Sequence, residues 1–136
     1  MSAWESLFRA QVSVMRRLTA EFPRSISLNE YDVLFNLSRL ENRSCRLRDL
    51  TEQTLLTQPS ISRMIDRLVA RGLVEKTPDP SDGRGTIVRL TDDGAEAYRA
   101  VAIEHARSID THLSSALSRE ELAELERLTT KLRRAL

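Results

Sequence analysis

TQPSISRMIDRLVAR, residues 57–71, carries the strongest structural signal in the chain. Its apolar residues recur at helical spacing, which predicts an amphipathic helix with one buried face. Thr57 is a candidate N-cap whose hydroxyl would accept a first-turn amide, and Pro59 suits a first turn because its missing N–H costs nothing there. Gly72 predicts a left-handed residue that ends the helix. The apolar face consists of Ile61, Met64, Ile65 and Leu68, with Val69 at its edge.

The opposite face of this helix carries short hydroxyls and arginine in place of large apolar side chains. Short hydroxyls let the backbone approach a nucleic acid closely, and Arg63 can donate two parallel hydrogen bonds to guanine O6 and N7. We therefore interpret the helix as a recognition helix that enters a major groove. The alternative is a surface helix with solvated arginines. The residues on this face are Pro59, Ser62, Arg63, Asp66, Arg67 and Ala70.

A short helix precedes the recognition helix. Residues 48–54 predict a helix with Leu50 turned inward, and Leu55 with Leu56 forms the turn. Two helices joined by so short a turn define a helix-turn-helix. Such pairs often carry Ala and Gly at their tight contacts. Because Thr51 and Leu55 occupy those positions here, we expect a slightly different turn geometry.

Two alternating segments follow the recognition helix. Residues 73–77 and 86–90 alternate apolar and polar side chains, as half-buried strands do. They flank PDPSDGRG, residues 78–85, a predicted loop, so that the segment reads as a β-hairpin wing. At its tip we hypothesise that Asp82 orients Arg84, whose guanidinium enters the minor groove, where narrow A·T tracts concentrate negative potential. The alternative is a solvated charged turn.

The N-terminal part of the chain predicts two further helices. Residues 3–18 form a long amphipathic pattern with a wide apolar stripe. Ser27 and Glu30 form an S-x-x-E capping box that opens the second helix, which we expect to continue to Leu40. A short strand at residues 45–47 then leads into the helix-turn-helix.

The C-terminal part predicts two long helices, the first capped by Thr91 and the last by a capping box of Ser118 and Glu121. Their apolar stripes are too long for a small winged domain to bury, and an unburied stripe promotes association. Together with the first helix we expect them to build an isologous dimer interface. The stripes are Ala95, Tyr98, Ala102, His105, Ile109, Leu113 and Leu117, and then Leu122, Leu125, Leu128, Leu132 and Leu136.

These patterns predict a mainly α protein with a small β-wing, a winged helix-turn-helix with six helices. We expect residues 27–91 to form the DNA-binding domain and residues 1–26 and 92–136 to form dimerisation helices. A length of 136 residues fits a small domain with dimerising arms. The net charge is only +1, but residues 39–90 hold ten Lys/Arg against seven Asp/Glu, so the positive excess surrounds the recognition helix.

Composition also limits the location of the protein. No apolar run approaches the roughly 20 residues that a membrane span requires. Glu5 and Arg9 interrupt the apolar segment that a signal peptide would need. Cys45 is the single cysteine, which excludes an internal disulfide. We therefore expect a cytoplasmic protein that does not bind membranes.

The assembled pattern resembles the MarR (multiple antibiotic resistance regulator) family of winged-helix transcription factors over nearly its full length. The most specific segments are QPSISRMIDRLVARGLVEK, residues 58–76, and DGRGTIVRLTDDG, residues 82–94, which resembles the wing signature of the family. The resemblance implies a homodimer on pseudo-palindromic operators, usually a repressor, released from DNA by a small aromatic or phenolic ligand. It also implies the DNA contacts: Gln58, Pro59, Ser60, Ser62 and Arg63 in the recognition helix, and Asp82 and Arg84 in the wing.

Other residues receive weaker assignments. Ser44, Arg46 and Arg67 are candidates for phosphate contacts, which position a protein on DNA without specifying sequence. Peroxide-sensing members use a cysteine in the first helix, so Cys45 is interpreted as an inert small apolar residue. Glu104, His105 and His112 make a poor metal-ligand set, and the histidines are interpreted as surface or interface groups. We expect no metal and no cofactor, and the sequence assigns no ligand-binding residues.

Three other classes of function remain as alternatives. An enzyme is not expected, because no nucleophile set, phosphate-binding loop or paired catalytic carboxylates occur at usable spacing. A helical protein-interaction module without ligand control would share the long helices but would not need the serine–arginine face. A non-specific architectural DNA binder is the nearest alternative.

Overall fold

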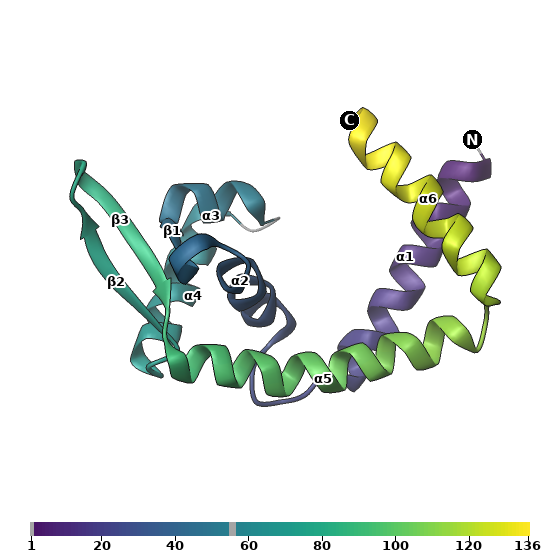
Figure 1. Cartoon of the computed structure of the whole chain (residues 1–136), viewed down its shortest axis with the longest axis horizontal. Coiled ribbons are helices and arrows are strands. Elements are labelled where there is room, and N and C mark those ends of the chain that lie inside the picture. Colours follow the sequence, from purple (N-terminus) through teal and green to yellow (C-terminus); the bar gives the residue numbers. More distant parts are fainter. Residues whose placement is uncertain (1, 55–56) are drawn as a thin grey trace. The chain divides into compact units, whose positions relative to one another are not determined.

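A computed structural model describes residues 2–54 and 57–136 (Figure 1). The six α-helices and the three-stranded sheet confirm the predicted fold class. The predicted turn at Leu55 and Leu56 lies outside the described residues. The elements are α1 (Ser2–Glu21), α2 (Leu28–Ser38), the 3-10 turn η1 (Glu41–Arg43), β1 (Ser44–Arg46), α3 (Leu47–Gln53), α4 (Gln58–Ala70), β2 (Val74–Asp79), β3 (Asp82–Leu90), α5 (Asp92–Ser114) and α6 (Arg119–Ala135).

The chain folds into two compact units. One contains the residues up to Phe22 together with Glu104–Leu136, and the other contains Pro23–Ile103. We call the second the winged unit, because it holds α2, α3, α4 and the whole sheet. In this division the first turns of α5 belong to the winged unit.

The start of α5 packs against the junction between α4 and β2. Thr91 Oγ1 donates to the Gly72 carbonyl at 2.7 Å, and the Thr91 N–H donates to the Leu73 carbonyl at 3.1 Å. Thr91 Oγ1 also accepts from the Gly94 N–H at 3.0 Å, which is the predicted cap. A Cβ on Gly94 would lie 1.9 Å from the Leu73 carbonyl oxygen, so this approach requires glycine. Gly72 has φ +72°, and it ends α4 as predicted.

The sheet has the strand order β1-β3-β2, with both pairs antiparallel. Val88 in the central strand pairs with Cys45 on one side and with Lys76 on the other. The predicted apolar face of α4 is buried and packs into the core of the winged unit. The largest fully buried side chains of this core are Val33, Leu34, Leu37, Leu50, Ile61, Ile65, Leu68, Val74, Val88 and Leu90.

The wing differs from the prediction in its length. The expected loop at residues 78–85 is wrong, because β2 continues to Asp79 and β3 begins at Asp82, which leaves two residues for the turn. Pro78 pairs with Thr86, and a register shift follows at Asp79. Proline is tolerated here because β2 is an edge strand.

Several predicted boundaries move by a few residues. The helix expected to reach Leu40 ends at Ser38, and the chain then turns through Asn42 and Arg43, which have φ of +54° and +52°. The capping boxes of Ser27–Glu30 and Ser118–Glu121 are both present, each with its two reciprocal hydrogen bonds. In the described part of the chain, no helix has the length and apolar content that crossing a bilayer requires.

Candidate nucleic-acid interface

Helix α4 presents a polar face to solvent over a fully packed apolar face. Arg63 and Arg67 are exposed, and Ser60 and Ser62 are half-buried. The guanidinium of Arg63 makes no hydrogen bond or ion pair with another described side chain, so it is available to an external acceptor. Pro59 is exposed in the first turn, and Gln58 is the first helical residue. The predicted recognition residues therefore share one helix and its first turns.

The start of α4 corrects one detail of the prediction. Thr57 is the N-cap residue, but its hydroxyl caps no first-turn amide. Instead Thr57 Oγ1 donates to Ser60 Oγ at 3.0 Å. The Thr57 carbonyl still accepts the first helical hydrogen bond, from the Ile61 N–H at 3.0 Å.

Two ion pairs hold the far part of α4. Lys76 Nζ in β2 lies 2.5 Å from Asp66 Oδ1. Arg71, directly after α4, donates from Nη2 to the Ser25 carbonyl at 2.7 Å, and its Nη1 lies 3.4 Å from Glu30 Oε2. Glu30 also closes the capping box of α2. These contacts fix the exposed face of α4 relative to the rest of the winged unit.

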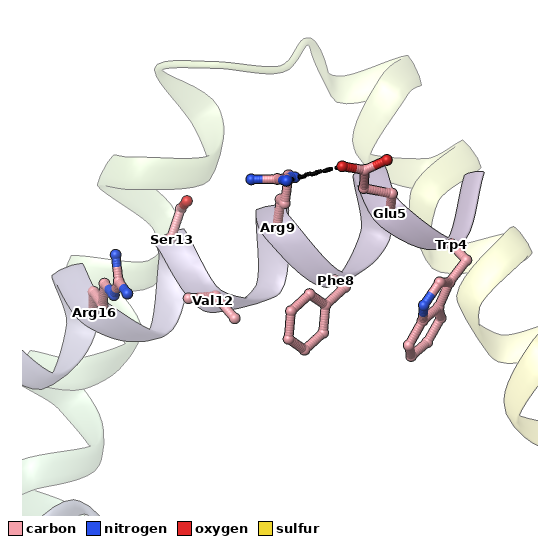
Figure 2. Close-up of a pocket in the computed structure, with 7 residues that line it drawn as sticks. All are labelled: Trp4, Glu5, Phe8, Arg9, Val12, Ser13 and Arg16. Carbon is pink, nitrogen blue, oxygen red and sulfur yellow. Dashed lines mark hydrogen bonds and ion pairs between the residues drawn. The ribbon is translucent and has the colours of Figure 1, made fainter. Parts of the chain in front are cut away.

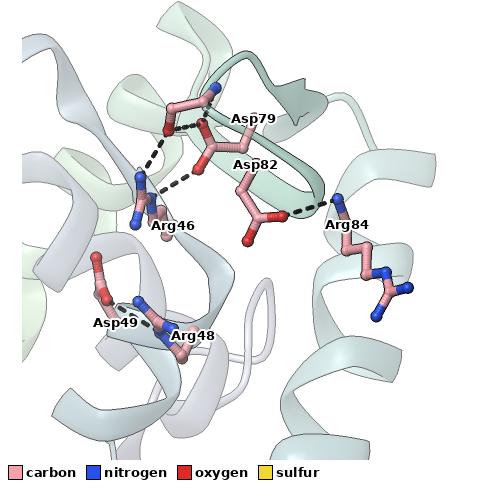
Figure 3. Close-up of polar contacts among 7 residues, drawn as sticks. Arg46, Arg48, Asp49, Asp79, Asp82 and Arg84 are labelled. Carbon is pink, nitrogen blue, oxygen red and sulfur yellow. Dashed lines mark hydrogen bonds and ion pairs between the residues drawn. The ribbon is translucent and has the colours of Figure 1, made fainter.

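The wing tip places Arg84 in solvent. Asp82 contacts Arg84 through the backbone, because the Arg84 N–H donates to Asp82 Oδ1 at 3.1 Å. Figure 3 shows the Arg84 guanidinium pointing away from the Asp82 carboxylate. Asp82 therefore shapes the turn that carries Arg84, whereas the sequence suggested only that it orients the side chain.

A polar cluster around the buried Asp79, at the end of the wing, was not predicted. Arg46 Nε in β1 lies 2.7 Å from Asp79 Oδ2, and Arg46 Nη2 donates to Ser81 Oγ at 2.7 Å (Figure 3). Asp79 Oδ1 accepts from the Ser81 N–H at 2.9 Å and from the Ser81 hydroxyl at 2.8 Å. Only 4% of the Asp79 side chain is exposed. Arg46, a candidate phosphate contact in the sequence, is thus engaged within the protein.

The same contacts explain the protonation of Asp79. The Ser81 backbone N–H and the Ser81 hydroxyl, followed by the charge of Arg46, lower the pKa of the Asp79 carboxyl below its ordinary value, against the opposing effect of burial. The carboxylate is therefore ionised at neutral pH. A charge that is buried in this way needs its counter-charge.

The surroundings of Cys45, His105 and His112 bear on the roles that the sequence assigned to them. Burial, and then the charge of Asp49, raises the pKa of the half-buried Cys45 thiol, which disfavours the reactive thiolate. His112 Nε2 lies 2.7 Å from Glu21 Oε2, and the His105 ring packs edge-on to Phe22 at 5.0 Å. Within residues 2–54 and 57–136, no three His, Cys, Asp or Glu side chains gather as a metal site.

An aromatic cluster joins α2 and α5 within the winged unit. The Tyr31 and Tyr98 rings lie 5.4 Å apart, and Phe35 lies 6.4 Å from Tyr31. The Arg39 guanidinium lies 5.2 Å from the centre of the Phe35 ring. Burial, followed by the influence of Tyr98, raises the pKa of Tyr31 to about 12, so its hydroxyl stays protonated.

A helix-turn-helix followed by a β-hairpin defines a winged-helix protein. Residues 25–85 match the model of the MarR family. The resemblance found in the sequence is thereby confirmed. Members of the family are transcription regulators and not enzymes, which agrees with the prediction on catalysis.

Curated relatives and solved structures are similar to this chain. The multiple antibiotic resistance protein MarR of Salmonella typhimurium is 36% identical over 73 residues, which are 54% of this chain and 51% of the relative. The chain thus spans about half the length of the first curated relatives it matches. The structure of AbsC, a MarR family transcriptional regulator from Streptomyces coelicolor, has a TM-score of 0.81 and 29% identity and covers 99% of this chain and 95% of its own.

Two further solved structures are described with a DNA or a ligand. A mutant MarR from E. coli, complexed with operator DNA, has a TM-score of 0.80 and 26% identity, with 97% of this chain and 94% of that chain covered. BpsR of Bordetella bronchiseptica, whose DNA binding is regulated by 6-hydroxynicotinic acid, has a TM-score of 0.80 and 26% identity, with 98% and 99% covered.

Proposed function

We propose that this chain is a homodimeric, sequence-specific DNA-binding regulator of transcription that acts as a repressor on pseudo-palindromic operators. The observation that carries the proposal is the exposed face of α4, where Arg63 and Arg67 lie opposite the buried apolar side chains of the same helix. An α-helix fits the major groove, and an unpaired guanidinium at its surface can read guanine. The operator complex of the similar E. coli MarR supports this reading.

The residues divide into three roles in this proposal. Arg63 reads bases, while Ser60 and Ser62 contact bases or phosphates. Arg67 contacts the phosphate backbone. In the wing, Asp82 shapes the turn and Arg84 enters the minor groove. Pro59 and Gln58 complete the predicted contacts at the start of α4.

The dimer is inferred from the apolar faces of α1 and α6. Trp4 and Phe8 are 66% and 52% exposed, and their rings stack at 5.9 Å. Figure 2 shows both rings on one side of α1, away from the Glu5–Arg9 ion pair. An exposed face of this kind favours association with a second copy.

A groove between α1 and α6 extends this face. It has a volume of about 440 Å³, and nearly all of its lining is apolar. Leu132 is 48% exposed within it. A two-fold dimer built on α1 and α6 would carry two copies of α4, which bind major grooves one helical turn apart at roughly 34 Å. The lining residues are Trp4, Leu7, Phe8, Gln11, Thr129, Leu132, Arg133 and Leu136.

Leu132→Ala is expected to weaken dimerisation by roughly tenfold, since each copy loses the burial of part of a leucine side chain. Sedimentation equilibrium at several concentrations measures the change. Val69→Ala is the matched control, because Val69 is an exposed apolar residue of α4 outside this face. Equal dimer dissociation constants for the two variants would contradict the assignment of the interface.

Arg84→Ala is expected to weaken binding to the operator and to make its salt dependence shallower, with roughly 0.9 lost from the slope per ionic contact removed. Fluorescence anisotropy at several salt concentrations measures both quantities. Arg89→Ala is the control, because Arg89 lies on β3 and pairs with Glu75. If Arg84→Ala leaves the slope of the salt dependence unchanged, the wing is not part of the DNA interface.

The proposal as a whole is tested by selection of DNA from random duplexes with the purified protein. A two-fold symmetric consensus supports the dimer, the recognition helix and the spacing together. Binding without a consensus would favour an architectural DNA binder instead. Failure to bind duplex DNA would favour a protein-interaction module.

Release by a small aromatic ligand is a separate part of the proposal. It is supported by BpsR, which is similar to this chain and responds to a hydroxylated aromatic acid. Tyr31 and Tyr98 offer aromatic faces for stacking in the winged unit. Titration of phenols and hydroxylated aromatic acids into the operator complex tests this part. A ligand releases DNA only if it binds the DNA-free state more tightly.

A further inference from the structure

The cluster of Arg46, Asp79 and Ser81 connects the two outer strands of the sheet. β1 and β2 do not pair with each other, because β3 lies between them. Arg46 on β1 nevertheless forms an ion pair with Asp79 at the end of β2. The arginine side chain must therefore extend across the central strand to reach the wing turn.

Near the wing turn, β3 carries Gly85, which has no side chain. A Cβ on Gly85 would lie 3.0 Å from Asp79 Cβ and 3.2 Å from Asp79 Oδ2. The Asp79 side chain thus packs directly against the β3 backbone. These residues line one small pocket, whose lining is Arg46, Arg48, Asp79, Asp82, Arg84, Gly85 and Thr86.

The hairpin extends beyond the part of β3 that pairs with β1. β1 pairs only with residues 87–89 of β3, so the outer part of the wing is a two-stranded ribbon. An isolated two-stranded hairpin is only marginally stable in water. Arg84 lies on this ribbon, two residues after the start of β3. Its location therefore depends on what holds the turn.

The three-residue cluster is suited to hold that turn. Asp79 Oδ2 is buried and accepts no hydrogen bond from a described residue, so the charge of Arg46 is its compensation. Opening the cluster would leave a buried carboxylate unpaired, which is strongly unfavourable. The Glu75–Arg89 pair on the same hairpin is exposed, and exposed pairs contribute little.

We propose that Arg46, Asp79 and Ser81 form a latch that fixes the wing turn where Arg84 reaches DNA. They are positioning residues that touch no DNA themselves. The inference rests on the proposed function and adds residues to it. A wing held in its bound position before contact loses less conformational freedom on binding, and this raises affinity.

A double-mutant cycle tests the latch. Asp79→Asn, Arg84→Ala and the double variant are compared on the selected operator by fluorescence anisotropy. Asp79→Asn preserves shape but removes the charge, and it is expected to weaken binding about tenfold. In the Arg84→Ala background the same change is expected to have less than about a twofold effect, because the side chain that the latch positions is absent.

Two controls accompany the cycle. Glu75→Gln removes the exposed ion pair of the same hairpin, and it should leave affinity unchanged in both backgrounds. Amide hydrogen exchange at Ser81 of the free protein reports whether the latch is closed without DNA, because the Ser81 N–H donates to Asp79. Faster exchange at Ser81 is expected in Asp79→Asn. If that variant does not fold, Ser81→Ala keeps the ion pair and should show a weaker coupling of the same sign.

The outcomes separate the two proposals. Wild-type protein that selects no DNA would overturn the proposed function. Wild-type protein that binds its operator, with additive effects of Asp79→Asn and Arg84→Ala, overturns the latch alone. An operator affinity that Arg84→Ala leaves unchanged also overturns the latch, because there is then no DNA contact for it to position.

Discussion

Arg63→Ala is expected to weaken operator binding by about 5- to 150-fold and to relax the base preference at one position in each half-site, in line with about 1–3 kcal/mol for a bidentate contact to guanine. The physical reason is the location of Arg63 on the exposed face of a helix whose other face is fully packed. The helix has no freedom to rotate and replace the missing contact. Affinities for the operator, for single-base variants and for random duplex measure the effect.

Arg67→Ala is the matched control for this prediction. Arg67 is one helical turn further along α4 and is also exposed. As a phosphate contact it should weaken binding to operator and random duplex alike, and reduce the salt slope. If Arg63→Ala shows that same uniform loss, Arg63 does not read bases.

Gly94→Ala is expected to destabilise the fold by about 3 kcal/mol or more, at the upper end of the cost of overpacking. A Cβ at this position would meet the Leu73 carbonyl oxygen at 1.9 Å, the carbon of that carbonyl at 2.9 Å and Leu90 at 2.7 Å. The obstacle includes backbone, which cannot move aside as a flexible side chain does. Relief would require the start of α5 to withdraw from the junction of α4 and β2 and to break the Thr91 contacts with Gly72 and Leu73.

Chemical denaturation of the two variants Gly94→Ala and Gly83→Ala measures this effect. Gly83 is exposed in the wing, and a Cβ there would meet nothing within 4 Å. Its substitution should change the free energy of unfolding by no more than about 0.5 kcal/mol, as surface changes usually do. Similar stabilities for both variants would show that α5 does not depend on this close approach.

The elements that could be predicted from the sequence are those specified by local patterns. Helical periodicity and the terminating Gly72 located α4, and Ile61, Ile65 and Leu68 are buried as the pattern indicated. The capping boxes need only residues three apart, so both were found. Alternation along residues 73–77 and 86–90 predicted the wing strands.

The wing turn was harder to predict because proline was interpreted as a loop residue. Pro78 belongs to a strand, because β2 is an edge strand and does not need an N–H donor at every residue. Asp79 and Ser81 at a spacing of two are a local turn signal that was available in the sequence. Arg46 lies far from both in the chain, and only the strand order β1-β3-β2 brings it to Asp79.

The residues of the candidate site could also be predicted only in part. Exposure of Arg63, Arg67 and Arg84 follows from periodicity and from loop position, and the structure agrees. Which bases or phosphates they contact stays a prediction, because contact depends on a partner that the sequence does not describe. The pairing of Arg46 with the buried carboxylate of Asp79 could not be predicted, because the two residues lie far apart in the chain.

The proline in the outer strand of the wing has a consequence for solubility. An open sheet edge offers unpaired N–H groups to strands of other molecules and so invites aggregation. Pro78 has no N–H to offer, Pro80 follows directly after β2, and Lys76 adds a charge to the same strand. The hairpin can therefore protrude without recruiting a foreign strand, which keeps its length clear for a nucleic acid.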